Sequence, residues 1–292
     1  MEVKRGKLKV MHYPIIDLHM HLRGDIAKHT KIAKESGINL VVYMANTQPP
    51  LDSVESIKRS LKVKRHCRAL PVSAITKRLA GKELVDIEKI RPWVVGFSDD
   101  GKYLADLKLL VAILKKGVLV MAHCSPAYEV GLTKPFFETG FIKRYLMVLE
   151  KIGGKLHIQH ISQKSSVDLI RKAKKSGLKF TCETCPHYFT YTAADLDVKI
   201  NPPLGNGEDV AAVRQGLADG TIDAIASDYA PEPRITGIAG FRSFLPLCYG
   251  LVLQGALSEK QLKEKLFLNP KKIIESSGFK LKLTSPLLPS IR

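Results

Sequence analysis

Residues 15–24 read IIDLHMHLRG, and this stretch places two histidines, His19 and His21, directly after a short apolar run. The run begins at Ile15 and is typical of a buried strand. Side chains one residue apart on a strand point to the same side, so these two imidazoles can bind one metal ion. Alone, the pair is weak support for a metal site, because this spacing arises by chance in many proteins.

Further apolar runs end in residues of the kind that bind metals. They are Asp100 in FSDDG (97–101), His123 in MAHC (121–124), His160 in HIQH (157–160) and Asp228 in ASDYA (226–230). Histidine and carboxylate ligands without clustered thiolates suit one or two Zn²⁺ ions in an open catalytic site. With two ions, a bridging hydroxide would be the nucleophile, and Asp228 would take and return its proton.

Short apolar runs alternate with longer segments of helical period along the whole chain. We expect strands at 15–19, 40–44, 68–73, 93–97, 118–122, 155–160, 179–183 and 223–227, with helices at 26–36, 54–62, 103–115, 136–151 and 165–176. This alternation predicts an α/β fold, a parallel (β/α)8 TIM barrel, whose chemistry gathers at the carboxyl ends of the strands. We expect a single barrel over residues 1–292, with 1–14 and 280–292 as short terminal extensions.

Composition narrows the class of protein further. The net charge of +18 is spread over lysine-rich helical stretches, which favours solvated helix faces; attraction of anionic substrates or an acidic partner is the alternative. No nucleic-acid motif accompanies the charge, and no apolar run is long enough to cross a membrane. The N-terminal residues lack an apolar signal core, and the 5 cysteines are odd in number and scattered. We therefore expect a cytoplasmic protein with reduced thiols.

The order of motifs resembles the dihydroorotase family of the amidohydrolase superfamily. The motifs are DLHMHLRG (17–24), MANTQPP (44–50), FSDDG (97–101), AHC (122–124), HIQHIS (157–162), CETCPHYFTYT (182–192), INPPLG (200–205) and ASDYAPE (226–232). The resemblance favours the bacterial-type branch, with an aspartate in the DDG motif where relatives use a carboxylated lysine. It implies reversible cyclisation of N-carbamoyl-L-aspartate to L-dihydroorotate in de novo pyrimidine biosynthesis.

Carried over motif by motif, the resemblance also implies roles for individual residues. The metal centre would comprise His19, His21, Asp100, His123, His160 and Asp228, and Asp228 would double as the general acid and base. The substrate would be held by Arg23, Asn46, Asn201 and, in the glycine-rich loop 237–240, Gly240. A guanidinium fork suits a carboxylate, which supports the role of Arg23 independently. The choice of Asp100 over Asp99 rests on the motif, because spacing does not separate them.

The chain departs from the family pattern at several positions. Glu232 stands where the family has a histidine that contacts the substrate carboxylate, Gly205 replaces an arginine, and Ser125-Pro126 replaces an acidic pair. Relatives of this branch carry a small β-sandwich built from both ends of the chain. Little sequence flanks the barrel here, so we expect a bare barrel, whose uncovered surface suits homo-oligomerisation or a complex with aspartate transcarbamoylase.

These departures leave two alternatives to a dihydroorotase. One is another cyclic amide hydrolase of the hydantoinase type, which Glu232 and Gly205 favour, whereas Arg23 and Asn46 favour the dihydroorotase. The other is a non-catalytic partner subunit of aspartate transcarbamoylase, against which the complete ligand set weighs. For the remaining histidines we expect structural roles at His157 and His187 and surface positions at His12, His29 and His66.

Overall fold

The computed structural model describes residues 12–125, 136–231 and 240–281, and in them parallel strands form one sheet whose order follows the chain. The strands are β1 (Ile16–Met20), β2 (Leu40–Tyr43), β3 (Arg68–Ser73), β4 (Gly96–Phe97), β5 (Leu119–Ala122), β6 (Lys155–Ile158), β7 (Thr181–Thr184) and β8 (Ala224–Ile225). The last strand returns to the first, because Met20 forms a parallel bridge with Tyr229 and the His21 N–H donates to the Tyr229 carbonyl at 2.8 Å. The predicted (β/α)8 barrel is confirmed.

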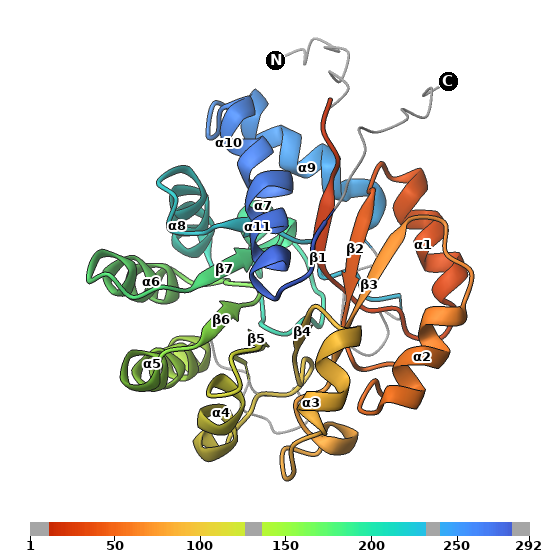
Figure 1. Ribbon diagram of the computed structural model, residues 1–292. Helices are drawn as coiled ribbons and strands as arrows, with labels where there is room; N and C mark the ends of the chain where they lie inside the picture. Colours follow the sequence, from red (N-terminus) through yellow and green to blue (C-terminus); the bar gives the residue numbers. More distant parts are fainter. Residues whose placement is uncertain (1–11, 126–135, 232–239, 282–292) are drawn as a thin grey trace.

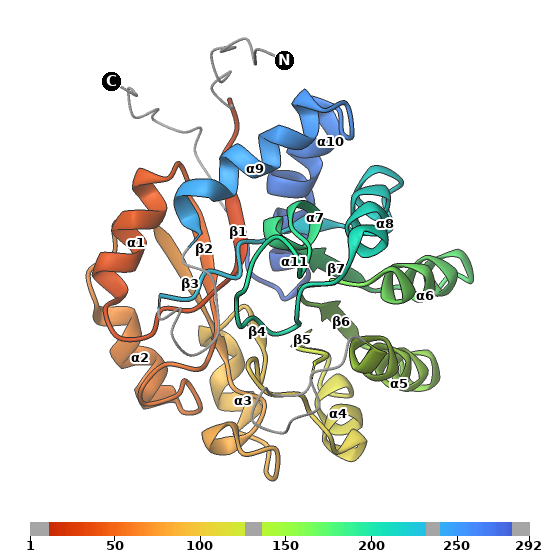
Figure 2. The same ribbon diagram turned by 180° about the vertical axis from the view of Figure 1, so that it is seen from behind.

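Helices surround the strands in Figures 1 and 2. They are α1 (Ile26–Glu35), α2 (Val54–Lys62), α3 (Ile87–Ile90), α4 (Leu107–Leu114), α5 (Phe136–Ile152), α6 (Lys164–Lys175), α7 (Pro186–Thr190), α8 (Gly207–Ala218), α9 (Phe241–Leu253), α10 (Glu259–Lys263) and α11 (Asn269–Ser276). Shorter 3-10 turns are η1 (Lys77–Leu79) and η2 (Arg91–Trp93), and η4 (Glu264–Leu268) is π-helical. No helix in the described ranges is long and apolar enough to cross a membrane.

Polar side chains fix where many of these helices begin. Asp25 accepts from the Lys28 N–H at 2.9 Å at the start of α1. Ser53 and Ser258 form capping boxes at α2 and α10, satisfying N–H groups that have no partner inside the helix. Asp25 and Ser53 lie in the loops after β1 and β2, so these two caps help to fix loops at the carboxyl ends of the strands.

The apolar residues form two main layers. One cluster joins outward-facing strand residues such as Val41 and Val120 to helix residues such as Ile57. A second contains alternate residues of β2 and packs against Ile273 and Ile274 of α11. Strands buried on both faces are characteristic of parallel sheets covered by helices. The strand predicted at 93–97 is wrong in its first half, since Trp93 ends η2, which Pro92 helps to start.

Glu138, in the first turn of α5, is a buried carboxylate whose protonation matters for stability. Its Oε1 accepts from the Ser162 N–H at 3.2 Å, beyond the end of β6. Burial raises the pKa of Glu138 from 4.5 to about 7, although hydrogen bonds from Ser162 and Ser166 act in the opposite direction. The folded protein therefore holds this proton more tightly than the unfolded chain does.

Stability from this group is complete at acid pH and is lost as the pH rises from about 4.5 to about 7. Glu138→Gln keeps a neutral side chain at every pH. We therefore expect the variant to lose less unfolding free energy than wild type between pH 5 and pH 8, by up to about 3 kcal/mol. Urea unfolding at the two pH values measures this difference, and identical pH dependence in both proteins would contradict it.

Candidate metal centre

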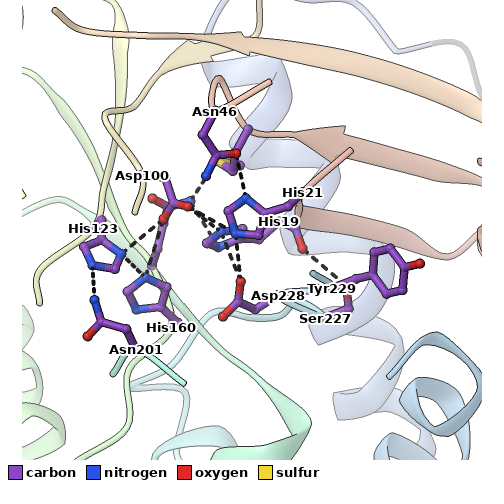
Figure 3. Close-up of polar contacts among 12 residues, drawn as sticks. His19, His21, Asn46, Asp100, His123, His160, Asn201, Ser227, Asp228 and Tyr229 are labelled. Atoms are coloured by element: carbon purple, nitrogen blue, oxygen red, sulfur yellow. Dashed lines mark hydrogen bonds and ion pairs between the residues drawn. The ribbon is translucent and has the colours of Figure 1, made fainter. Parts of the chain in front are cut away.

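The histidines and aspartates predicted as ligands lie together at the carboxyl ends of the strands (Figure 3). They leave β1, β4, β5, β6 and β8, and their side chains converge on one point inside the rim. The group consists of His19, His21, Asp100, His123, His160 and Asp228. All are buried except Asp228, whose side chain is 13% exposed, so the group is reached from solvent past that carboxylate.

Asp100 lies between two pairs of histidines. Its Oδ2 is 3.4 Å from His19 Nε2 and 3.2 Å from His21 Nε2. Its Oδ1 is 3.2 Å from His123 Nδ1 and 3.7 Å from His160 Nε2. One carboxylate oxygen thus faces the imidazoles of β1, and the other faces those after β5 and β6. This arrangement would let Asp100 help to hold a cation on either side of the cluster.

Asp228 faces only the β1 side of the group. Its Oδ1 is 3.2 Å from His21 Nε2 and 3.5 Å from His19 Nε2. The backbone is held in an unusual conformation, with φ of +48° at Asp228 and +39° at His160. Such left-handed backbone costs energy for residues other than glycine and is found at sites where the surroundings enforce it. Here it directs the side chains of Asp228 and His160 into the cluster.

The donor atoms fit a divalent cation. His19 Nε2 is buried and has no hydrogen-bond partner among the residues that the structure describes. His19 Nε2 nevertheless lies beside oxygens of Asp100 and Asp228. Within the described ranges, atoms close enough to share an ion occur in His19–Asp100–His160 and in His19–His21–Asp228. Imidazole nitrogens and carboxylate oxygens are the donor set of zinc and similar ions.

The electrostatics of the group favour ionised carboxylates. Burial alone would raise the pKa of Asp100, but the imidazoles of His19 and His21 outweigh it and hold that pKa well below its usual range. Burial is likewise outweighed by His19 and His21 at Asp228, whose pKa is also lowered. Two ionised carboxylates among imidazoles form a site that favours a cation.

Geometry separates the two neighbouring aspartates that spacing could not. Asp99 turns away from the histidines, and its Oδ1 accepts from the N–H groups of Ile75 at 2.8 Å and Thr76 at 3.0 Å. Its carboxylate therefore fixes the loop that follows β3. Asp100 is the aspartate that contacts the cluster.

The two asparagines predicted to hold substrate also hold imidazoles. Asn46 Oδ1 lies 2.8 Å from His21 Nδ1, and Asn201 Nδ2 lies 3.1 Å from His123 Nε2. Ser125 Oγ donates to Asn201 Oδ1 at 2.6 Å, which gives this serine a place in the site. Both asparagine side chains therefore lie at the rim, and one polar edge of each contacts a histidine of the cluster.

The other predicted substrate residues lie around the same rim. Arg23 is half-buried in the loop after β1, and Gly240 is half-buried at the start of α9. Glu232 and the first three residues of the glycine-rich loop, 237–239, lie outside the described residues.

A third group of residues that could share an ion was not predicted from the sequence: Cys185, His187 and Asp228. The sequence gives no sign that the start of α7 reaches Asp228.

His29 corrects one prediction, since it is buried rather than on the surface. Its Nδ1 lies 2.8 Å from the Tyr229 hydroxyl, and the Tyr229 ring stacks on Phe241 with centroids 4.0 Å apart. Tyr229 directly follows Asp228. These contacts therefore support the strained turn that presents Asp228 to the cluster.

At position 205, where the family has an arginine, the neighbouring Asp209 leaves no room for a side chain. A Cβ at this position would lie 2.3 Å from Asp209 Oδ2. That carboxylate is fixed, because its Oδ2 accepts from the Asn206 N–H at 2.9 Å in the capping box of α8. Its Oδ1 accepts from the Lys164 N–H, also at 2.9 Å.

We expect Gly205→Arg to displace Asp209 and to lower the unfolding free energy by about 1–2 kcal/mol, the usual worth of a helix cap. The matched control is Gly207→Ala, since no atom lies within 4 Å of a Cβ at Gly207. Urea unfolding compares the two variants. An arginine at position 205 that left stability unchanged would show that the cap adapts.

Comparison with known proteins agrees with this description, although no protein-family model matches the chain. Solved structures show the fold alone. The L-hydantoinase of Arthrobacter aurescens superposes with a TM-score of 0.80 over 90% of this chain and 71% of its own, at 20% identity. The inactive dihydroorotase-like domain of a Chaetomium thermophilum multifunctional protein gives 0.70 over 90% and 80%, at 18% identity. The fold and its histidine–aspartate cluster together define a (β/α)8 barrel with a candidate metal centre at the carboxyl ends of its strands.

Curated sequences give the particular family. A dihydroorotase of Trichlorobacter lovleyi is 33% identical over 306 residues, covering 89% of this chain and 72% of that protein. The dihydroorotases of Aquifex aeolicus and Staphylococcus epidermidis are also 33% identical, covering 93% and 96% of this chain and 75% and 77% of their own length. The chain belongs to the dihydroorotase family.

Proposed function

We propose that the protein is a metal-dependent dihydroorotase that interconverts N-carbamoyl-L-aspartate and L-dihydroorotate in pyrimidine synthesis. The observation that carries the proposal is Asp100 between two histidine pairs, in a chain whose relatives are named dihydroorotase. His19, His21, Asp100, His123, His160 and Asp228 would hold one or two ions, for which we propose Zn²⁺. A bound ion would polarise the amide carbonyl and activate water.

The chain's own residues would perform the remaining steps. In ring opening, Asp228 would accept a proton from the attacking water and pass it to the departing amide nitrogen; ring closure reverses this path. Its side chain is placed for this role because it is partly open to solvent and lies beside His21. Arg23 would bind the substrate carboxylate through paired hydrogen bonds. Asn46, Asn201 and Gly240 would line the remaining pocket.

We propose as partners an anionic small-molecule substrate and either a second copy of this chain or aspartate transcarbamoylase. The net charge of +18 favours attraction of the anionic substrate. We also propose a cytoplasmic location, where reduced cysteines such as the buried Cys124 and Cys248 persist.

The deciding experiment is hydrolysis of L-dihydroorotate by the purified protein, with added zinc and again after chelation. We expect turnover that the chelator abolishes and zinc restores. Hydantoin and dihydrouracil, which lack the ring carboxylate, serve as comparison substrates, and a preference for either would favour the hydantoinase alternative. No turnover of any cyclic amide by zinc-loaded protein would favour the non-catalytic alternative.

Arg23→Gln tests carboxylate recognition within the same assay. Losing a hydrogen bond to a charged group costs about 1.5–3 kcal/mol, so we expect KM for L-dihydroorotate to rise about 10–100-fold. The kcat/KM for dihydrouracil should stay near its wild-type value. An equal loss for both substrates would show that Arg23 supports the site in another way.

A further inference from the structure

Glu183, on β7, is a fully buried carboxylate in the barrel interior beneath the cluster. Its two oxygens face two different imidazoles. Oε1 lies 3.1 Å from His19 Nδ1, in hydrogen-bonding geometry. Oε2 lies 3.1 Å from His157 Nε2, but off the hydrogen-bonding direction, so this contact is one of charge and dipole. All three side chains are 0% exposed, so water does not screen their interaction.

The contact at His19 Nδ1 fixes which ring nitrogen carries the proton. A carboxylate oxygen has no proton to give, so a proton on Nδ1 makes the contact attractive and its absence would set two lone pairs face to face. With the proton on Nδ1, the lone pair of His19 lies on Nε2. Nε2 is the atom beside Asp100 and Asp228, at 3.4 and 3.5 Å (Figure 3).

His157 holds the carboxylate from the other side. Its Nδ1 lies 2.8 Å from Thr181 Oγ1, and when that hydroxyl donates, the ring proton remains on Nε2, which faces Glu183. Gln159 competes for the same place, because its Nε2 also lies 3.1 Å from His19 Nδ1. Because the amide N–H is a donor, it favours the other tautomer of His19, in which Nδ1 carries no proton. Glu183 carries a full negative charge and Gln159 only an amide dipole, so at equal distances the carboxylate has the stronger influence on where the His19 proton lies.

We propose that Glu183 is a positioning residue of the metal centre: it fixes the Nδ1-protonated form and the ring orientation of His19, while His157 fixes Glu183. The inference rests on the proposed metal centre. A carboxylate behind a metal-binding histidine raises its basicity and typically accounts for about 10–100-fold in metal affinity.

The test is Glu183→Gln in the full chain. An amide carries no charge and has one acceptor edge and one donor edge, so it cannot present an oxygen to both His19 and His157. We expect zinc affinity, measured by competition with a chromophoric chelator, to fall about 10–100-fold. Nitrogen-15 histidine spectra of the zinc-loaded protein should show His19 with a protonated Nδ1 in wild type and a loss of that signature in the variant.

Glu138→Gln is the matched control, because it also neutralises a buried glutamate, one that contacts Ser162 instead of a cluster histidine. Its zinc affinity should equal that of wild type. Wild type that bound no zinc would overturn the proposed function. A folded Glu183→Gln protein with wild-type zinc affinity and an unchanged His19 signal would overturn this inference alone.

Should Glu183→Gln fail to fold, Glu183→Asp takes its place. It keeps the charge but withdraws the carboxylate from His19 by one methylene. We expect an intermediate loss of zinc affinity with the Nδ1 proton retained, because the carboxylate still selects the tautomer while holding the ring less firmly. Unchanged affinity in this variant would overturn the proposal.

Discussion

Asp100→Asn should lose its metal and its activity together, whereas Asp99→Asn should keep both. Asp100 supplies an oxygen to each histidine pair, so its loss affects every ion the site can hold. Metal assistance is worth several kcal/mol, and about 1.4 kcal/mol corresponds to tenfold in rate. We therefore expect turnover of L-dihydroorotate to fall by at least about 10³-fold. Metal content by atomic emission and kcat measured on the same preparation test this result.

Asp99→Asn is a demanding control because the altered residue is the immediate neighbour. The substitution weakens the hydrogen bonds from Ile75 and Thr76, so we expect the unfolding free energy to fall by about 1–3 kcal/mol. Metal content and kcat should stay close to wild type at temperatures well below the melting transition. The opposite outcome, with metal lost in Asp99→Asn and kept in Asp100→Asn, would refute the assignment of the ligand.

Asp228→Asn should have the largest effect on the chemical step itself. Asparagine keeps the shape of the side chain and an oxygen beside His21 but has no basic oxygen to carry a proton. General acid–base catalysis usually contributes about 10²–10⁴-fold, and we expect kcat to fall by that factor. Substrate affinity and folding should change far less. Steady-state kinetics in both directions of the reaction measure this separation of kcat from KM.

The comparison variant is Asp223→Asn, at the other end of the segment 223–228, which contains β8. Asp223 accepts from Lys174 Nζ at 2.6 Å and from the Cys182 N–H at 2.8 Å, before β8 begins. Residues at that end of a barrel strand serve stability. We expect this variant to be less stable but to retain wild-type kcat. A fall in kcat as large as that of Asp228→Asn would mean that the whole segment, and not the carboxylate at its end, is what matters.

The sequence allowed the barrel and the location of the cluster to be predicted because both depend on local patterns. Apolar runs mark strands, and in a parallel barrel every strand delivers its last residues to the same rim. His19 and His123 could therefore be placed without knowing their neighbours. Strand ends were less predictable where local and tertiary preferences differ, as at Trp93, which Pro92 draws into a 3-10 turn.

The contacts that orient the ligands could not be predicted in this way. Asn46 reaches a histidine 25 residues away, Asn201 one 78 residues away, and Glu183 one 164 residues away. Nothing in the spacing of such pairs indicates contact. His29 was misplaced for the same reason, since Tyr229, which contacts it in the buried interior, is 200 residues further along the chain.

The barrel closes at a seam, where β1 meets the segment after β8. This seam also determines at what point during protein synthesis the site can form. His21 and Asp228 are neighbours across that seam yet lie 207 residues apart in the chain. At about 5–20 residues per second, a ribosome makes the second roughly 10–40 s after the first. Until then the nascent chain holds two histidines without their carboxylate partner across the seam. The complete metal site can therefore form only after Asp228 has been synthesised.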